Sequence, residues 1–461
     1  MMGNMVGAGI FIYPSLISTN LPHPSWFLLI WLIGGFVALT GALSSAELGS
    51  VYPEVGGDYA YLRNVYGIRW AFLYGFLAFF ITFPGSIALG VSLSVHFQGA
   101  TIFGPWIRET AFTLPLIGKI HYSQLIAALI LFGMTLINHL GIRSSIRLQK
   151  VFTLLPLTFL VIIYLIALSI IAYKYFFLPI DDSLILYNNL QIPYKGPNLL
   201  QLGTALVPVY WTFTGWNSPL ALGEEIKNPG KVIPLTMILG PTLVMLLYLS
   251  FAFVFIAVIP YQVLQAGKED PFYMMGVYLL NHVSPGQAQF LSYLPFIISL
   301  LIFLLVLGNT NSAIISGSRV SVAIARDRLF WKKIGELDKK RNTPVFSIWT
   351  QSLFALIMIL TVDKESNLLN FSFIAITVLS ILTIFSIFVI RLKKIQKEML
   401  YKAFGYPFTP LFYIIVSGAI LVLVVMKYIV EAKYSVVLSS LLSFVIGLSL
   451  FEFWKKFRKK E

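Results

Sequence analysis

The sequence predicts an all-α integral membrane protein with twelve transmembrane helices, and three observations predict this class. First, 58% of the 461 residues are hydrophobic and 11% are charged, whereas a soluble globular protein carries roughly 25% charged residues. Second, apolar runs of about 20 residues, the length that crosses a hydrocarbon core, recur along the whole chain. Third, the links between these runs are short, so we expect no extramembrane domain.

The apolar runs form two groups of five and a final pair. The first group lies near residues 1–18, 26–48, 70–99, 122–141 and 151–173. The second group lies near 199–222, 234–259, 290–317, 344–362 and 368–390, and the pair near 408–428 and 434–454. We expect one domain over residues 1–461, in which 1–173 form a first repeat, 199–390 a second repeat and 408–454 two additional helices.

Charge and cysteine content restrict the partners. The chain has no cysteine, which excludes disulfides, thiolate metal ligands and a disulfide-linked subunit. The net charge of +14 arises mainly from Lys and Arg in alternate links, a pattern that marks cytoplasmic loops rather than nucleic-acid binding. We therefore expect a multi-pass protein of the plasma (inner) membrane with both termini cytoplasmic. Its expected partner is the lipid bilayer, with no nucleic acid, no metal and no cofactor.

The first apolar run contains three glycines within seven residues, Gly3, Gly7 and Gly9. Each weakens a helix by roughly 1 kcal/mol relative to alanine, so we expect the helix to break here. A break frees backbone N–H groups, which need a partner inside a membrane. The amides of Gly7, Ala8, Gly9 and Ile10, at the start of the next helix, are suited to bind an anion such as a substrate carboxylate. Close packing of small residues against another helix explains the same glycines equally well.

The start of the chain lies unusually near this motif. Only residues 1–6 precede Gly7, which is short for the first half of a broken helix. We therefore expect the natural start of the protein to lie further upstream.

The sixth apolar run is interrupted as well, within residues 211–219. Gly215 and Pro219 weaken a helix there. Breaks in the first and sixth spans are expected of inverted five-helix repeats, which hold a substrate between their discontinuous helices near the bilayer midplane. The carbonyls of Phe213 and Thr214 are suited to accept hydrogen bonds from an ammonium group, while the amides of the first break bind a carboxylate. The two breaks together predict a zwitterionic substrate.

Several motifs, in order along the chain, resemble those of the amino acid, polyamine and organocation (APC) superfamily. They are Gly7-Ala8-Gly9-Ile10-Phe11 with Pro14; Glu47-Leu48-Gly49 with Tyr52-Pro53-Glu54-Val55-Gly56-Gly57-Asp58-Tyr59; Glu224-Glu225-Ile226-Lys227-Asn228-Pro229 with Ile233-Pro234; and Arg319 with Ala325-Arg326-Asp327 and Thr343-Pro344. The resemblance spans nearly the whole chain and implies a ten-helix inverted-repeat core plus two helices. Within the superfamily, Gly215-Trp216-Asn217 and Glu224-Glu225 look most like the L-type amino acid transporters and their bacterial relatives.

The resemblance also implies roles for single residues. Trp211 lies where related exchangers carry an aromatic gate over the substrate, and Phe213 is the alternative. Sodium sites of this fold combine carbonyls of the first span with hydroxyls of the eighth, and the candidates here are Asn309, Thr310, Asn311 and Ser312; helix packing explains these residues too. Some relatives place a lysine in the fifth span where this chain has Pro156, which leaves uniport, exchange (antiport) and symport open.

We therefore expect a secondary transporter, a permease that moves amino acids by alternating access. A cationic substrate side chain inside a membrane usually needs a carboxylate partner. Glu47, Glu224 and Glu225 lie at span ends and the core has no other acid, which favours a neutral amino acid. Asn217 would bind a polar substrate tail or cap the broken helix. The alternative is a polyamine or cationic amino acid carrier of the same superfamily, because Tyr210-Trp211 and Trp216-Asn217-Ser218 resemble its pattern.

Two other classes of membrane protein fit the sequence less well. An intramembrane enzyme needs a nucleophile with a base, or a metal cluster, at membrane depth, and no HExxH, GxSxG or paired intramembrane carboxylates occur. We expect no enzymatic activity. A channel needs a ring of carbonyls or charges along an open path, whereas paired helix breaks favour a closed site in the middle of the bundle.

Overall fold

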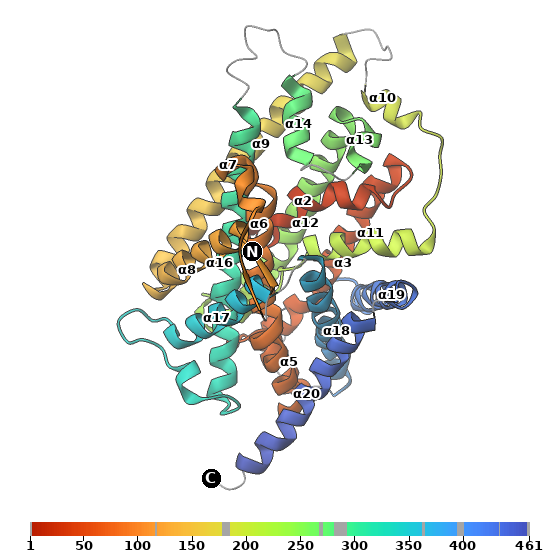
Figure 1. Ribbon diagram of the computed structural model, residues 1–461. Coiled ribbons are helices and arrows are strands. Elements are labelled where there is room, and N and C mark those ends of the chain that lie inside the picture. Colours follow the sequence, from red (N-terminus) through yellow and green to blue (C-terminus); the bar gives the residue numbers. More distant parts are fainter. Residues whose placement is uncertain are drawn as a thin grey trace.

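The computed structural model describes residues 2–115, 118–177, 185–266, 271–280, 293–361, 365–393, 401–432 and 434–458. It is an elongated bundle of helices, in which the first helices lie near the middle and the last one reaches one tip (Figure 1). Within the described residues, nine helices are long and apolar enough to cross a membrane. The expectation of a helical, multi-pass membrane protein is therefore confirmed.

The long helices coincide with nine of the twelve predicted runs. They are α3 (Pro24–Val51), the continuous α5 (Ile68–Leu77), η1 (Ala78–Thr82) and α6 (Phe83–Phe97), α8 (Tyr122–His139), α9 (Ile142–Phe177), α12 (Pro229–Val258), α16 (Leu294–Arg326), α18 (Glu365–Leu392), α19 (Phe408–Val430) and α20 (Tyr434–Arg458). Residues 290–292 of the predicted eighth run lie outside the described residues.

The other three runs contain shorter helices. They are α1 (Met2–Met5) and α2 (Ala8–Ser18) in the first run, α11 (Leu199–Thr212) in the sixth and α17 (Val345–Thr361) in the ninth. Two of these three runs are the ones that carry the Gly and Pro interruptions, because those residues weaken the hydrogen-bonded helix.

Short elements occupy the links. They are α4 (Asp58–Tyr66), α7 (Gly99–Phe103), η2 (Pro105–Arg108), α10 (Ile185–Leu190), η3 (Ser218–Ala221), η4 (Gly223–Glu225), α13 (Tyr261–Gln265), α14 (Pro271–Leu280) and η5 (Lys332–Gly335). The all-α expectation needs one correction: β1 (Thr110–Leu114) and β2 (Gly118–His121) pair as an antiparallel hairpin, with Thr110 opposite His121. Backbone N–H groups outside a helix need acceptors, and in this hairpin the carbonyl groups of the paired strands accept from them.

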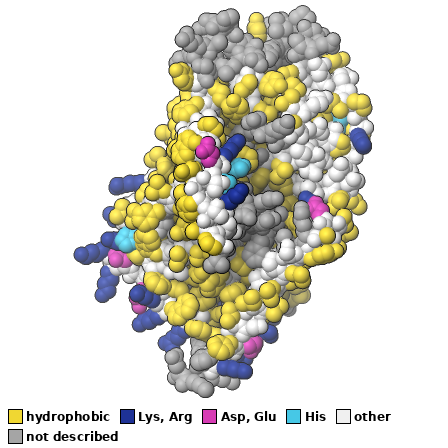
Figure 2. Space-filling view, in the orientation of Figure 1, with side chains coloured by type: hydrophobic (Ala, Val, Ile, Leu, Met, Phe, Trp, Pro, Cys, Tyr) yellow, Lys and Arg dark blue, Asp and Glu magenta, His cyan; other side chains and the backbone are white. Residues whose placement is uncertain are grey.

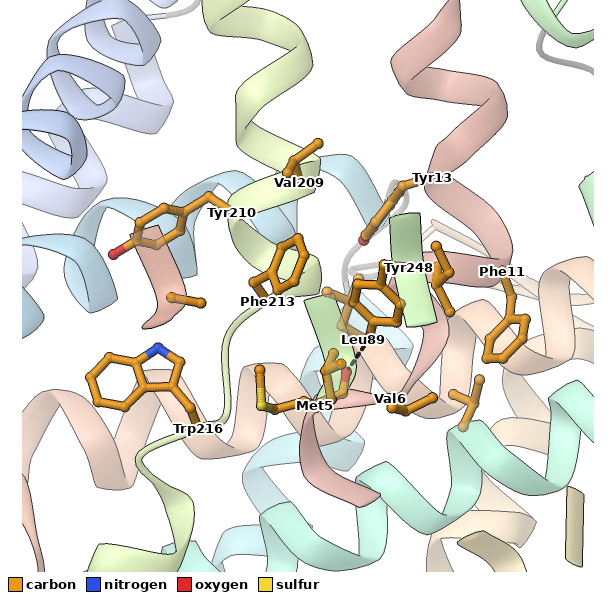
Figure 3. Packing of buried hydrophobic residues seen from close by; sticks show 14 of the residues in the cluster. Met5, Val6, Phe11, Tyr13, Leu89, Val209, Tyr210, Phe213, Trp216 and Tyr248 are labelled. Atoms are coloured by element: carbon orange, nitrogen blue, oxygen red, sulfur yellow. Dashed lines mark hydrogen bonds between the residues drawn. The ribbon is translucent and has the colours of Figure 1, made fainter. Parts of the chain in front are cut away.

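Helices far apart in the sequence pack side by side in the bundle. Helix α3 lies along α12, α16 lies against α6 and α9, and α2 lies against α11. Buried aromatic rings fill the space between them. The Phe213 ring centroid lies 5.0 Å from that of Tyr248 (Figure 3), and 6.2 Å from that of Trp31. Such tilted and edge-on arrangements are favourable for aromatic pairs, so the rings of Trp31 and Tyr248 support the end of the sixth run at Phe213.

The surface of the bundle is apolar along α9 and basic at one end. In the apolar window of α9 only 18% of the residues are buried, and large side chains such as Leu154, Phe159 and Leu165 face outward, as expected of a helix in contact with lipid. Lys and Arg side chains gather toward the end of the molecule where α17 begins and α20 ends (Figure 2). This separation agrees with the charge pattern of the links.

Candidate substrate site

The first break lies between α1 and α2. Gly7 has an extended backbone (φ −139°, ψ −153°), and α2 begins at the next residue. The carbonyl oxygens of the preceding fragment are held by other helices: the Tyr248 hydroxyl of α12 donates to Met5 O over 2.8 Å (Figure 3), and the Asn309 amide of α16 donates to Asn4 O. These contacts anchor α1 although it is only one turn long.

The second break follows α11. The chain turns through residues 213–217 before η3, and Gly215 has φ +95°, a conformation that side-chain-bearing residues rarely adopt. The hydroxyl of Thr214 donates to the carbonyl of Trp211 over 2.6 Å, and that of Thr212 to Pro208 O over 2.6 Å. Side-chain donors thus bond to the carbonyls at the end of the interrupted helix.

The two breaks lie against each other. The Asn4 side chain donates from Nδ2 to Gly215 O over 3.1 Å and contacts the Ser218 hydroxyl. A Cβ atom on Gly9 would lie 2.3 Å from Thr212 Oγ1, so only glycine fits at this crossing of α2 and α11. Close packing therefore explains Gly9.

A cavity of about 150 Å³ lies where the breaks meet. Among the lining residues, the sequence had singled out Gly7, Gly9, Trp211, Thr214, Gly215, Asn217 and Asn309. A cavity of this size accommodates a molecule as large as benzene. Backbone amides and carbonyls near a broken helix, in a cavity of this size, are suited to bind a small polar molecule.

Three of the predicted binding residues are not among the residues described as lining the cavity. The side chains of Ile10 and Phe213 are buried in the hydrophobic core, and Phe213 packs between Trp31 and Tyr248. Phe213 therefore does not fit the alternative role of gate, because its ring already has a full set of apolar neighbours. Ala8 begins α2, and its side chain lies outside the described residues.

Two of the predicted cation-site residues form side-chain hydrogen bonds, one within α16 and one to neighbouring helices. Thr310 donates its hydroxyl to Val306 O over 3.0 Å. The Asn311 side chain accepts from Asn138 over 2.7 Å and donates to Gln149 over 2.9 Å, and Ser312 is half-buried on the same helix. Asn309 immediately precedes Thr310 on α16 and points in another direction. Among the described hydrogen bonds of these candidates, its bond to Asn4 O is the one that reaches the first break.

The expectation that the core holds no acid besides the span-end glutamates is wrong, because Asp58 lines the cavity and is 5% exposed. The loop before it turns back into the bundle at Gly56 (φ +102°) and Gly57 (φ +53°). Gly56 N donates to Ala221 O over 3.1 Å, so this loop packs against the second half of the sixth run. Two consecutive positive φ values, which glycine tolerates, bring the acid inside.

Asp58 and Asn217 form a hydrogen bond inside this cavity. Asn217 Nδ2 donates to Asp58 Oδ2 over 2.6 Å, which gives Asn217 a protein partner in place of the predicted substrate tail. Helix α4 lies outside the membrane-spanning helices. Burial raises the pKa of Asp58 to about 6, although the hydrogen bond from Asn217 favours the ionised form.

Ion pairs surround the ends of these elements. Arg319 Nε lies 2.7 Å from Glu225 Oε1, Arg326 lies 2.9 Å from Glu224, and Arg63 lies 2.9 Å from Asp327. They join η4 and α4 to the end of α16. The two glutamates predicted to lie at span ends are therefore engaged in ion pairs.

Glu47 is engaged in the same way, although it is more deeply buried. Only 1% of its side chain is exposed, and it accepts from Arg391 Nε over 2.9 Å and from Ala403 N over 2.6 Å. A buried carboxylate requires such partners. Glu47 therefore ties α3 to the end of α18 and does not enter the cavity.

A cavity between two broken helices, inside a bundle of apolar helices, defines the chain as a membrane transporter. The family described as amino acid permease matches residues 1–451. The chain belongs to this amino acid permease family, which confirms the resemblance to the APC superfamily and amino acid transport as the function.

Curated relatives are similar over most of this chain. The serine/threonine exchanger SteT of Bacillus subtilis (strain 168) is 25% identical over 92% of this chain and 87% of its own length. The human large neutral amino acids transporter small subunit 2 is 25% identical over 82% of this chain and 66% of its own length. The mouse b(0,+)-type amino acid transporter 1 is 26% identical over 81% of this chain and 70% of its own length.

Sequence reasoning gave no role in the site to several polar residues that line the cavity, among them Asn4, Asp58 and Ser218. Asn4 was readable as a polar residue beside the first glycines of an apolar run. Asp58 follows Gly56-Gly57, whose turn was treated as part of a cytoplasmic link. The missing signal was the direction in which that turn sends the chain, which depends on packing against Ala221.

Proposed function

We propose that this protein is a secondary transporter of small neutral amino acids that works by alternating access. The observation that carries the proposal is the cavity of about 150 Å³ that both helix breaks line. Its size favours small substrates, and the names of two relatives include serine, threonine and large neutral amino acids. The absence of a core acid no longer supports neutrality, because Asp58 lies in the cavity.

Within this proposal, the substrate carboxylate binds the backbone amides at the start of α2, from Gly7 to Ile10. Gly7 and Gly9 line the cavity there, and a helix N-terminus favours an anion. The ammonium group binds the carbonyls of Phe213 and Thr214, and Trp211, which also lines the cavity, covers the substrate.

Contacts between helices support a proposed twelve-span fold with a five-plus-five inverted repeat. Each of four elements in the first repeat packs on the element five spans later: α2 on α11, α3 on α12, α6 on α16 and α8 on α17. A pseudo-two-fold axis through the bundle produces such pairing. We assign residues 1–173 and 199–390 to the repeats and 408–454 to the two additional helices, with both termini cytoplasmic in the plasma membrane.

The proposal is tested by uptake into proteoliposomes that contain the purified chain. The panel is L-serine, L-threonine, L-leucine, L-arginine, L-glutamate and putrescine, in vesicles that are empty or preloaded with the same compound. We expect saturable uptake of L-serine and L-threonine, and stimulation by preloading would indicate exchange. Uptake confined to L-arginine or putrescine would refute the neutral substrate, and protein-free vesicles serve as the control.

A further inference from the structure

A groove outside the substrate cavity lies between the start of α5 and the last turns of α20, two helices that pack together (Figure 1). Its volume is about 430 Å³, within the range of about 300–1,000 Å³ that is typical of sites for small molecules. The two helices contribute Ile68 and Arg69 from α5, and Phe451, Glu452, Trp454 and Lys455 from α20.

Much of the lining of this groove is apolar. Phe451 is 6% exposed, and Ile68 is half-buried. The indole of Trp454 is held in place by a hydrogen bond from Nε1 to Arg328 O over 3.1 Å. Such a lining is suited to hydrocarbon, because burial of apolar surface stabilises a contact by about 25 cal/mol for each Å².

Two cations line the same groove and have few partners. More than half of the Arg69 side chain is exposed, and Lys455 is exposed as well. Among the described residues, Arg69 has one charged partner, with 3.7 Å between Arg69 Nε and Glu452 Oε1, which is too long for a hydrogen bond. In the same part of the chain, no acid forms an ion pair with Lys455. Both cations therefore have N–H donors available for an anion.

Both helices carry a tryptophan beside a cation at this level. Trp70 follows Arg69 at the start of one membrane-spanning helix, and Trp454 precedes Lys455 near the end of another. In the apolar window Val437–Lys456 of α20 only 22% of the residues are buried. Tryptophan beside Lys or Arg is typical of the boundary between hydrocarbon and lipid head groups. The groove therefore lies where lipid phosphates are expected, at the basic end of the molecule (Figure 2).

We propose that this groove binds an anionic phospholipid of the surrounding bilayer, with the phosphate between Arg69 and Lys455 and an acyl chain against Ile68 and Phe451. Basic pockets between membrane-spanning helices are suited to anionic lipid head groups, and a guanidinium group binds phosphate through two parallel N–H donors. The groove carries two cations and one carboxylate, Glu452, so its charge complements a lipid that has no cationic head group.

This lipid joins α20 to a helix that lines the substrate cavity. Helix α5 continues through η1 into α6, and Ser86 and Leu89 of α6 line that cavity. The bound lipid should therefore stabilise the folded bundle whichever amino acid is transported, and the inference does not depend on the proposed substrate.

The first test locates the lipid on the wild-type chain. Proteoliposomes of phosphatidylcholine contain the full chain and a small fraction of phosphatidylglycerol with a photoreactive group on its acyl chain, and mass spectrometry identifies the labelled peptides. We expect the label to concentrate at residues 66–69 and 451–455. Unlabelled phosphatidylglycerol should displace it, whereas additional phosphatidylcholine and soluble glycerol phosphate should not.

Three results of this test would overturn the proposal. Label spread evenly over the outer helices would show that the groove is not a site. Equal displacement by phosphatidylcholine would show that the site does not select an anionic lipid, and equal displacement by glycerol phosphate would show a site for free phosphate. This measurement does not depend on any variant folding correctly.

The second test removes the two cations. Arg69→Gln combined with Lys455→Gln should weaken phosphatidylglycerol binding about thirtyfold, because each Lys or Arg near an anionic lipid contributes roughly fivefold in affinity. The measurement is the rise in melting temperature in detergent as phosphatidylglycerol is added. Lys227→Gln combined with Lys231→Gln, which removes two exposed cations outside the groove, is the matched control and should keep the wild-type affinity. Equal losses for both pairs would show a general attraction of charge and no site.

Glu452→Gln tests the same site in the opposite direction. The substitution removes the carboxylate that competes with phosphate for Arg69, so phosphatidylglycerol should bind roughly fivefold more tightly, in the same melting assay. Unchanged lipid affinity, with a lower melting temperature in the absence of lipid, would show that Arg69 serves the ion pair alone and would contradict the assignment of the phosphate.

Discussion

The side-chain amide of Asn4 donates to the carbonyl of Gly215 over 3.1 Å, and so joins the first helix break directly to the second. The same residue accepts from Asn309 through its own carbonyl oxygen. One residue of a four-residue helix therefore connects three elements that line the cavity. Alternating access requires such elements to move relative to one another, so this junction is expected to control the transport rate.

Replacing Asn4 by alanine should slow transport without unfolding the protein. The side-chain hydrogen bonds are lost, each worth about 1 kcal/mol, and transport at saturating substrate should fall roughly tenfold. The measurement is the initial uptake rate, with size-exclusion chromatography to check the fold. Asn20→Ala, whose side chain bonds only to its neighbours Leu16 and Thr19 among described contacts, is the control. Equal rates for both variants would contradict a role for the junction.

Substitution of Gly9 tests whether close helix packing or substrate binding requires a glycine at the first break. A Cβ atom there would lie 2.3, 2.6 and 2.7 Å from three side-chain atoms of Thr212. Gly9→Ala should therefore destabilise the protein by about 1–3 kcal/mol and abolish uptake. Thr212→Gly removes all three atoms, and the double variant should regain much of the stability and uptake, as measured by thermal melting and transport.

Rescue would assign the requirement to the crossing of α2 and α11. A double variant that melts like the wild type but binds no substrate would instead show that the added methyl group blocks the backbone amides from Gly7 to Ile10. Thr212→Gly alone gives the baseline for the lost hydroxyl, which donates to Pro208 O.

Local composition allowed some features to be predicted, and tertiary packing decided the others. The breaks were predictable because Gly7, Gly9 and Gly215 change helix stability wherever they occur. The direction in which the Asn311 side chain points was not predictable. Each one-residue step along a helix turns the side chain by about 100°, and the positions of α8 and α9 decide which side chain of α16 they can bind. The cavity acid was missed for the same reason: a loop enters the bundle only if its backbone finds partners there.

Trp211 and Phe213 should respond differently to truncation, although they are two residues apart. Trp211 lines the cavity, so Trp211→Ala should accelerate substrate release roughly tenfold, since burying a large apolar side chain is worth about 1.5–3 kcal/mol, and should leave the melting temperature nearly unchanged. Phe213 is 2% exposed, so Phe213→Ala should cost about 3–5 kcal/mol of stability. Dissociation kinetics of bound substrate and thermal melting separate the two effects. The reverse pattern would exchange the roles of gate and core residue.

Asp58 should make the wild-type protein less stable as the pH rises. The folded state binds the proton with a pKa raised from 3.8 to about 6, so it holds that proton more tightly than the unfolded chain does. The contribution of this bound proton to the free energy of unfolding is fully present below about pH 4 and is lost as the pH rises through about 6. The free energy of unfolding falls by about 3 kcal/mol over this range, because each pKa unit corresponds to about 1.4 kcal/mol. Asp58→Asn cannot ionise, so the variant should be the more stable protein at about pH 7.5. Melting curves of both proteins in the same detergent, from about pH 4.5 to pH 8, measure this difference, and parallel pH profiles would show that Asp58 has an ordinary pKa in the folded state.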